Sequence, residues 1–281
     1  MKMIGIVGGG IMGSGIAQVC AQAGFGVIIV ETSAALCEKA KQQIAQSIDR
    51  SIEKKLLKKL DKPKILNQIT VTTDFNPLQQ STFVIEAIPE ILKIKKELFK
   101  KLDQLLPSGV ILASNTSSIS ITELAKATQR PDKVIGMHFM NPVPAMPLVE
   151  IIVGKKTSSA TLKAIQSLSR TLGKTTVVAK DAPGFISNRI LVPMINEAIL
   201  CLQEKIGTKE DIDTVMKLGM RHPMGPLELA DFIGLDTVLE IQEILYKGFK
   251  NPKYRPAKLL QQKVRAGKLG KKSGEGFYKY K

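Results

Sequence analysis

The chain has 281 residues, of which 44% are hydrophobic, and its 41 Lys and Arg residues against 25 Asp and Glu residues give a net charge of +16. No apolar run approaches the ~20 residues that span a bilayer, and three widely spaced cysteines indicate neither a disulfide framework nor a metal cluster. With no cleavable leader before its first strand pattern, we expect a cytoplasmic protein of two domains that attracts anions.

The N-terminal stretch IGIVGGGIMGSGIA contains glycines in the G-x-G-x-x-G spacing, following a strand pattern and opening a helix. Gly8 allows a tight turn, Gly10 lets the backbone approach a pyrophosphate, and Gly13 lets the helix pack close to the strand. The first helical residues, Ile11 and Met12, would present N–H groups to the phosphates. The pattern therefore predicts a dinucleotide site; the alternative is a glycine-rich turn that binds nothing.

The second predicted strand, VIIV (27–30), ends at Glu31, 18 residues after Gly13. An acidic side chain there can accept hydrogen bonds from the ribose hydroxyls of the adenosine and would repel a 2′-phosphate. The position therefore favours NAD over NADP.

Residues 33–66 are expected to form a helical arm, with one long helical pattern over 33–60. Six lysines lie between 54 and 64. Arg50 and Lys54 are four residues apart and share one helix face, which makes them candidates for phosphate contacts, whereas most of the lysines are expected to form a solvated face. The narrow apolar stripe of the pattern consists of Leu36, Ala40, Ile44, Ile48, Ile52, Leu56 and Leu60.

Further strand patterns alternate with helical segments such as 91–105 and 121–128, which predicts a parallel sheet covered on both faces. The segment ASNTSSIS (113–120) ends one of these strands, where an open α/β sheet places its ligands, so Asn115 and Ser117 are candidate site residues. The remaining strand patterns are FVIEAI (83–88), VILAS (110–114), VIGMHF (134–139) and LVEIIV (148–153).

The segment HFMNPVPAMPLVE (138–150) contains one of only two histidines in the chain. A strand, a proline-bounded loop and a return strand would bring Glu150 to the ring of His138. A carboxylate on one ring nitrogen fixes the tautomer, and a histidine held in that way can act as a general base. The alternative is a satisfied histidine at a strand end.

Beyond DAPGF (181–185) the β signal disappears, and helical patterns predict an all-α domain over 186–281 after a sheet domain over 1–185. Pro183-Gly184 is the expected joint. Asn188, in the first turn of the first helix of that domain, is expected at the cleft between the two domains. The predicted fold class is α/β, with a Rossmann-like doubly wound sheet followed by an all-α C-terminal domain.

The chain resembles the short-chain L-3-hydroxyacyl-CoA dehydrogenases of the bacterial 3-hydroxybutyryl-CoA dehydrogenase type. The resemblance covers nearly its whole length and rests on several motifs together. These include VIEAIPE, ILASNTSS, GMHFMNPVP, LVEII, DAPGFISNRIL, RHPMGPLELADFIGLD and GKKSGEGFYKYK.

The resemblance implies oxidation of a (3S)-3-hydroxyacyl-CoA to a 3-ketoacyl-CoA with NAD, and the reverse reduction. His138 matches the catalytic base and Glu150 its carboxylate partner, and Ser117 and Asn188 match residues that bind the substrate oxygens. The resemblance also implies a homodimer formed through the helical domain. The other implied contacts are Asn141 in the same region, Glu90 and Lys95 near the nicotinamide and ribose, and Arg50 and Lys54 for coenzyme A.

Three features depart from the family pattern: Glu31 stands where Asp is frequent, Gly9 where Ala is usual, and Pro147 where Lys is common. Two other functions remain open, a non-catalytic protein on a dehydrogenase fold and a dehydrogenase of free 3-hydroxy acids. The charge alone would also suit nucleic acid, but aromatic residues make up only 5% of the chain and no reading motif is present. We therefore expect an acyl-CoA ligand, with no nucleic acid, membrane or metal.

Overall fold

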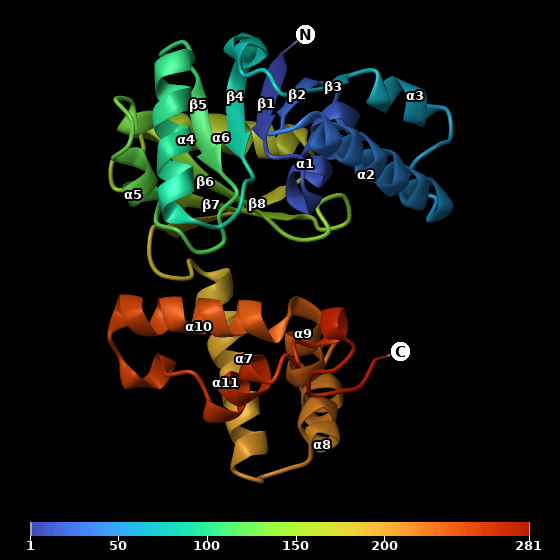
Figure 1. The fold of residues 1–281 in the computed structure, drawn as a ribbon, viewed down its shortest axis with the longest axis vertical. Coiled ribbons are helices and arrows are strands. Elements are labelled where there is room, and N and C mark those ends of the chain that lie inside the picture. The colour runs from blue at the N-terminus through green and yellow to red at the C-terminus, as the bar shows by residue number, and fades with distance from the viewer. Residues whose placement is uncertain (1, 281) are drawn as a thin grey trace. The chain divides into compact units, whose positions relative to one another are not determined.

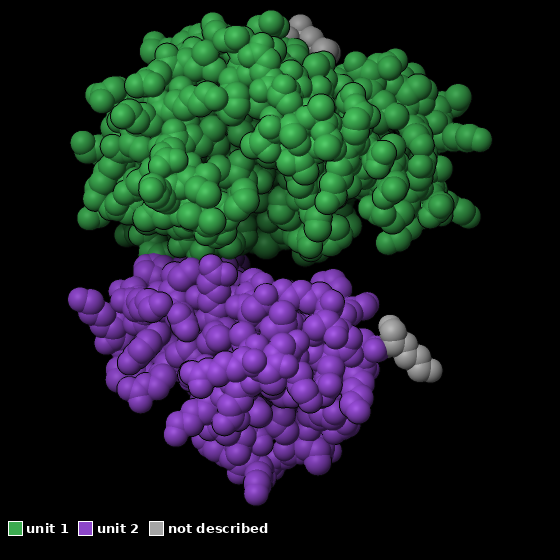
Figure 2. All heavy atoms as spheres, in the orientation of Figure 1, with its two compact units in different colours: residues 1–182 green, residues 183–281 purple. Residues whose placement is uncertain are grey.

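The computed structural model describes residues 2–280. The chain divides into two compact units between Ala182 and Pro183, beside the predicted joint (Figure 2). The first unit is a sheet with flanking helices and the second is built from helices (Figure 1), so the predicted fold class is confirmed.

The first unit is organised around one sheet of eight strands in the order β3-β2-β1-β4-β5-β6-β7-β8. All neighbouring pairs are parallel except β6 and β7, which are antiparallel. The antiparallel pair agrees with the return strand expected after the proline-bounded loop, because that loop is too short for the crossover that a parallel pair needs. The strands are β1 Met3–Val7, β2 Gly26–Val30, β3 Ile69–Thr72, β4 Ser81–Glu86, β5 Ile111–Ser114, β6 Val134–Phe139, β7 Leu148–Val153 and β8 Thr175–Lys180.

Helices cover both faces of this sheet, and α4 and α6 lie on opposite faces (Figure 1). Several helices begin with a side-chain cap. For example, Ser158 accepts a hydrogen bond from Thr161 N at the start of α6. The helices are α1 Ile11–Gln22, α2 Ala34–Glu53, α3 Asp61–Leu66, α4 Leu92–Leu105, α5 Ile121–Ala125 and α6 Ser159–Thr171, with short 3₁₀ turns η1 Asn76–Gln80 and η2 Pro131–Lys133.

Alternation along the strands sorts the side chains between the two faces. On the face covered by α1 and α6, Ile85, Ala113, Met137 and Ile151 join one continuous hydrophobic cluster. The residues that follow or precede these in sequence point to the opposite face. That face therefore receives four polar side chains from four neighbouring strands, namely Glu86, Ser114, His138 and Glu150.

Two strands were not predicted from the sequence, β3 at one edge of the sheet and β8 at the other. Both are only partly buried, and several of their side chains are exposed. Edge strands need no continuous apolar run, so a search for buried runs does not detect ITVT and TTVVAK.

The predicted single helix over 33–60 is wrong in its last third, because α2 ends at Glu53 and α3 begins only at Asp61. Leu56 and Leu60, the last residues of the apolar stripe, are 65% and 78% exposed. The helix ends through a left-handed residue, because Lys55 has a φ of 59° and the N–H groups of Lys55 and Leu56 donate back to the carbonyls of Ile52 and Ser51 at 2.9 and 2.8 Å.

Arg130 stabilises the end of α4, where the last carbonyls of a helix lack partners within the helix. Its Nε lies 2.7 Å from Asp103 Oδ1, and Nη2 donates to the carbonyls of Asp103 and Leu106 at 2.7 and 2.9 Å. The side chain is almost fully buried.

We expect Arg130→Met to lower the free energy of unfolding by about 3 kcal/mol, because the Asp103 carboxylate loses its charged partner and retains the hydrogen bond from Gln129 N, while three carbonyls lose their donor. Denaturant titration measures this. The matched control is Lys133→Met, which removes one surface contact from Lys133 Nζ to the carbonyl of Ser108 and should cost less than about 1 kcal/mol. Equal losses for the two variants would contradict the assigned role of Arg130.

The second unit packs its helices around a core of their own. Of the apolar residues in its central sequence, Leu227, Leu235 and Val238 are fully buried in this core, whereas Phe232 is exposed. Its helices are α7 Ser187–Gln203, α8 Lys209–Thr214, the π-helix η3 Val215–Gly219, α9 Pro226–Ile233, α10 Leu235–Phe249 and α11 Lys258–Arg265, with 3₁₀ turns η4 Pro252–Tyr254 and η5 Lys271–Ser273.

Candidate active site at the carboxyl ends of the strands

The strand order of the first unit reverses around β1 and β4, and in open α/β sheets ligands bind outside the carboxyl ends of the strands at such a point. The loops that leave these strands are joined by backbone hydrogen bonds. Ala87 N donates to Val7 O at 2.8 Å, and Asn115 N donates to Glu86 O at 2.8 Å. The loops after β1, β4 and β5 therefore meet at one edge of the sheet.

The glycine-rich turn has the shape that a dinucleotide requires. A Cβ on Gly13 would lie 1.8 Å from the carbonyl oxygen of Gly8, so only glycine allows α1 to pack this closely. A Cβ on Gly10 would meet no protein atom within 4 Å, which leaves open space in front of its backbone. Ile11 and Met12 follow at the N-terminus of α1, whose first turn has no side-chain cap and no acidic residue. These features fit a bound pyrophosphate.

Glu31 lies directly after β2, and its carboxylate reaches back to the glycine turn. Oε1 accepts a hydrogen bond from Gly9 N, and Oε2 accepts one from Thr32 N at 3.1 Å. Both contacts use backbone donors, so the carboxylate is held beside the turn as a hydrogen-bond acceptor. This is the position from which an acid binds ribose hydroxyls.

His138 and Glu150 form a buried pair near the carboxyl end of β6, one step from the end of the antiparallel ladder. They are directly opposite each other in the register of β6 and β7, and His138 Nδ1 lies 3.1 Å from Glu150 Oε2. The predicted contact is therefore confirmed. Because the carboxylate is an acceptor, Nδ1 carries the proton in this contact, and Nε2 of the neutral ring is then a proton acceptor. His138 is 7% exposed.

The loop from Asn141 to Pro147 joins these two strands and is fixed from outside by Lys174. This buried side chain donates to the carbonyls of Val143 and Met146 at 2.6 and 2.7 Å. Burial lowers the pKa of Lys174. Asn141 is exposed at the start of the loop. No sequence signal points to Lys174, which is a single lysine before an edge strand.

Asn115 connects the loop after β5 to the strand that carries His138, because its Oδ1 accepts a hydrogen bond from Phe139 N at 2.9 Å. Ser117 lies two residues further on. Its N–H donates to Glu90 Oε1 at 3.0 Å, and its hydroxyl lies 3.4 Å from the same oxygen. Asn115 and Ser117 thus follow the carboxyl end of β5, and His138 lies near the carboxyl end of the neighbouring strand β6.

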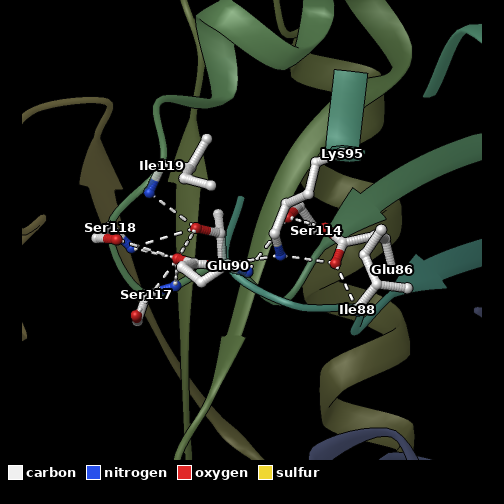
Figure 3. A network of polar contacts seen from close by, with 9 residues as sticks. Glu86, Ile88, Glu90, Lys95, Ser114, Ser117, Ser118 and Ile119 are labelled. Atoms are coloured by element: carbon white, nitrogen blue, oxygen red, sulfur yellow. Dashed lines mark hydrogen bonds and ion pairs between the residues drawn. The ribbon is translucent and has the colours of Figure 1, made fainter. Parts of the chain in front are cut away.

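Glu90 belongs to a network that also contains Glu86 and Lys95 (Figure 3). Lys95 Nζ lies 2.6 Å from Glu86 Oε1 and 2.9 Å from Glu90 Oε2. Burial raises the pKa of Glu86 although Lys95 opposes it. Burial also acts to raise the pKa of Glu90, but Lys95 and the hydroxyls of Thr116 and Ser118 outweigh it, so that pKa lies below its usual value.

Glu86 was not among the predicted site residues, although FVIEAI contains a detectable signal, a charged residue inside an apolar strand. The remaining predicted residues lie elsewhere. Asn188 is buried in the first turn of α7, in the second unit. Arg50 lies in the last turn of α2 and Lys54 directly after its last residue, and both side chains are exposed.

Within residues 2–280, no group of three or more His, Cys, Asp or Glu side chains could hold a metal ion. Over the same residues, no helix combines the length and apolar character needed to cross a membrane.

Comparison with known proteins gives consistent matches over the whole chain. Residues 3–182 match the family model described as the 3-hydroxyacyl-CoA dehydrogenase NAD binding domain, and residues 184–280 match the C-terminal domain of the same family. A probable 3-hydroxybutyryl-CoA dehydrogenase of Bacillus subtilis is 50% identical over 280 residues, covering 100% of this chain and 98% of that protein. The human mitochondrial hydroxyacyl-coenzyme A dehydrogenase is 45% identical over 288 residues, covering 100% and 92%.

Among solved structures, the (S)-3-hydroxybutyryl-CoA dehydrogenase of Ralstonia eutropha superimposes with a TM-score of 0.97 at 49% identity, covering 100% of this chain and 99% of that one. The matched N-terminal domain is an NAD-binding domain, which confirms the cofactor that Glu31 predicts. The resemblance found in the sequence motifs is confirmed as well, and the chain therefore belongs to the 3-hydroxyacyl-CoA dehydrogenase family.

Proposed function

We propose that this chain is an NAD-dependent oxidoreductase that interconverts (3S)-3-hydroxybutyryl-CoA and acetoacetyl-CoA, with His138 as its general acid and base. The observation that carries the proposal is the buried His138–Glu150 pair. It lies at the carboxyl end of β6, and the glycine turn follows the carboxyl end of β1, which is parallel to β6 in the same sheet. Its relatives named 3-hydroxybutyryl-CoA dehydrogenase support the choice of substrate.

In the oxidation direction the base must take a proton from an alcohol, whose pKa is far above neutral. Deprotonation therefore has to accompany the loss of hydride from C3. His138 Nε2 takes this proton, while Glu150 keeps the proton on Nδ1 and stabilises the imidazolium that forms. In the reduction direction the imidazolium returns the proton to the oxygen. The hydroxyl of Ser117 and the amide of Asn188 are proposed as hydrogen-bond donors to the substrate oxygens.

NAD, when bound, accepts or donates the hydride. The residues proposed to hold it are those of the glycine turn and Glu31, with Asn115, Ser117 and Asn141 towards the reacting end. The N–H groups at the start of α1 neutralise the pyrophosphate. Glu90 and Lys95 are proposed to lie near the nicotinamide and ribose.

Two alternatives make different predictions, a dehydrogenase of free 3-hydroxy acids and a protein that has lost turnover. Initial rates of NADH oxidation with acetoacetyl-CoA, with free acetoacetate and with NADPH in place of NADH separate them. We expect turnover with the thioester and NADH, and values of kcat/KM at least about 100-fold lower for the free acid and for NADPH. Preference for the free acid would replace the proposed substrate, and no turnover with either would favour the non-catalytic alternative.

The arm of residues 33–66 is proposed to bind the phosphates of coenzyme A through Arg50 and Lys54. We expect the double variant Arg50→Ala/Lys54→Ala to raise KM for acetoacetyl-CoA about 10-fold at low salt with kcat unchanged, because two charge contacts of ~0.7 kcal/mol each amount to a factor of ten. KM should not change for an acetoacetyl thioester that lacks the nucleotide. Lys58→Ala/Lys59→Ala is the matched control on the same arm. An equal effect in the control would assign the binding to overall charge instead.

A homodimer formed through the second unit is also proposed. Large apolar side chains remain exposed on that unit at Ile206, Val215, Leu218, Met220 and Phe232, and a subunit interface would remove such side chains from water. Sedimentation equilibrium would give twice the chain mass if this is correct. Cytoplasmic location is proposed on the basis of three free cysteines and the bacterial relatives.

A further inference from the structure

Three charged side chains, Glu86, Lys95 and Glu90, are linked by direct contacts from the interior of the sheet to the turn that carries Ser117 (Figure 3). We call these three residues the relay. Glu86, at the end of β4, is 0% exposed and accepts hydrogen bonds from Ser114 Oγ at 2.6 Å and from Ile88 N at 2.8 Å. Its third donor is Lys95 Nζ. Ser114 lies in β5 and Lys95 in α4, whereas Ile88 lies in the loop that follows β4.

Lys95 lies in the first turn of α4 and is 1% exposed, although it is a lysine. Long charged side chains are rarely buried unless they are paired. Here the ammonium is shared by two carboxylates at 2.6 and 2.9 Å, so its donors are directed into the protein. These two contacts use two of the three N–H donors of the ammonium.

The second carboxylate, Glu90, differs from the first in what it binds. Its Oε2 is held by Lys95, while its Oε1 gathers donors from three consecutive residues of the turn after β5. These are the hydroxyl of Thr116, the N–H groups of Ser117 and Ser118 at 3.0 and 3.1 Å, and the hydroxyl of Ser118 at 3.0 Å. Because one oxygen organises the whole turn, a change in the rotamer of Glu90 would displace Ser117.

The hydroxyl of Ser117 makes the longest of these contacts, 3.4 Å from Glu90 Oε1. A carboxylate oxygen has about two lone-pair directions, and the shorter contacts already fill them. Glu90 Oε1 therefore holds the turn mainly through these shorter contacts, and the Ser117 hydroxyl contributes little to that support.

We propose that Glu86 and Lys95 are positioning residues that fix Glu90 and thereby hold the hydroxyl of Ser117 where it can donate to the substrate oxygen. This rests on the proposed function of the site. It gives Lys95 a positioning role in addition to the cofactor contact that the sequence resemblance implies. Because Glu86, Lys95 and Glu90 act through Ser117, loss of the relay should lower kcat only when the Ser117 hydroxyl is present.

A double-mutant cycle between Glu86→Gln and Ser117→Ala tests this. Glutamine keeps the shape of the Glu86 side chain and can still accept from Ile88 N and Lys95, and the hydroxyl of Ser114 can turn to accept from the new amide. We expect Glu86→Gln to lower kcat about 10-fold and Ser117→Ala about 100-fold. The double variant should be no slower than Ser117→Ala alone, and the dissociation constant for NADH should change less than about threefold in Glu86→Gln.

Two further variants complete the experiment. Lys95→Met should lower kcat as well, and Glu86→Gln/Lys95→Met removes both charges together if the single variant does not fold. Lys96→Met is the matched control, because Lys96 is the next residue of α4 but pairs with Glu123 at the surface, and its kcat should stay within about twofold of the wild type.

Three results would overturn the proposal: multiplication of the two effects to about 1,000-fold in the double variant, wild-type kcat in Glu86→Gln, or a large rise in the NADH dissociation constant of Lys95→Met with kcat unchanged. The wild-type chain is assayed alongside. If it does not turn over acetoacetyl-CoA with NADH, the proposed function itself fails and the positioning role fails with it. If it does turn over, additive effects remove the positioning role alone.

Discussion

His138→Ala is expected to lower kcat for acetoacetyl-CoA reduction by about 1,000-fold, because general acid–base catalysis contributes roughly 10²–10⁴-fold. The antiparallel pair β6 and β7 places this titratable ring directly against Glu150. Its removal takes away the proton donor and leaves the glycine turn intact, so the NADH dissociation constant should not change. Stopped-flow rates and an NADH fluorescence titration measure the two quantities.

Glu150→Gln serves as the companion variant, because it retains an acceptor for His138 Nδ1 but removes the charge that stabilises the imidazolium. We expect a smaller loss of kcat, about 100-fold. If His138→Ala retained near wild-type turnover, the assignment of the base would be wrong. A greater loss in Glu150→Gln than in His138→Ala would point to a direct role for the carboxylate.

Gly10→Ala is expected to weaken NADH binding by about 100-fold without lowering the melting temperature. A Cβ at this position meets no protein atom within 4 Å, so the folded chain tolerates it. The added methyl group would occupy the space through which the backbone approaches the pyrophosphate. The thermal melt and the NADH titration therefore separate this variant from one that merely unfolds.

Gly13→Ala should behave differently, because its Cβ would lie 1.8 Å from a backbone oxygen and would force α1 away from β1. Both stability and NADH affinity should fall. Gly109→Ala is the control in open space and should change neither. Unaltered NADH affinity in Gly10→Ala would show that the dinucleotide does not cross the glycine turn.

The features that the sequence predicted correctly are those with a strong local pattern. The contact between His138 and Glu150 follows from two strand patterns joined by a short loop containing prolines, since such a loop allows only a return strand. The glycine turn is equally local, because the strand, the turn and the helix are consecutive in the chain. Neither feature depends on residues distant in the sequence.

What could not be predicted depends on tertiary packing. The pairing of Lys95 with Glu86 requires the register of α4 on the sheet, and the turn around Glu90 requires the spacing between β4 and β5. The edge strands β3 and β8 are specified by their neighbours more than by their own composition. The end of α2 was predicted too late because the apolar repeat continues past Glu53, whereas the left-handed residue that ends the helix is a lysine and not a glycine.

The most direct test of the site is the crystal structure of the chain with NAD and acetoacetyl-CoA bound. We predict that His138 Nε2 lies within hydrogen-bond reach of the C3 oxygen, about 2.6–3.2 Å, with Nδ1 still on Glu150 and the hydroxyl of Ser117 on the same substrate oxygen. A substrate whose C3 oxygen is bound by another acid–base group, with His138 facing away from it, would contradict the proposed mechanism.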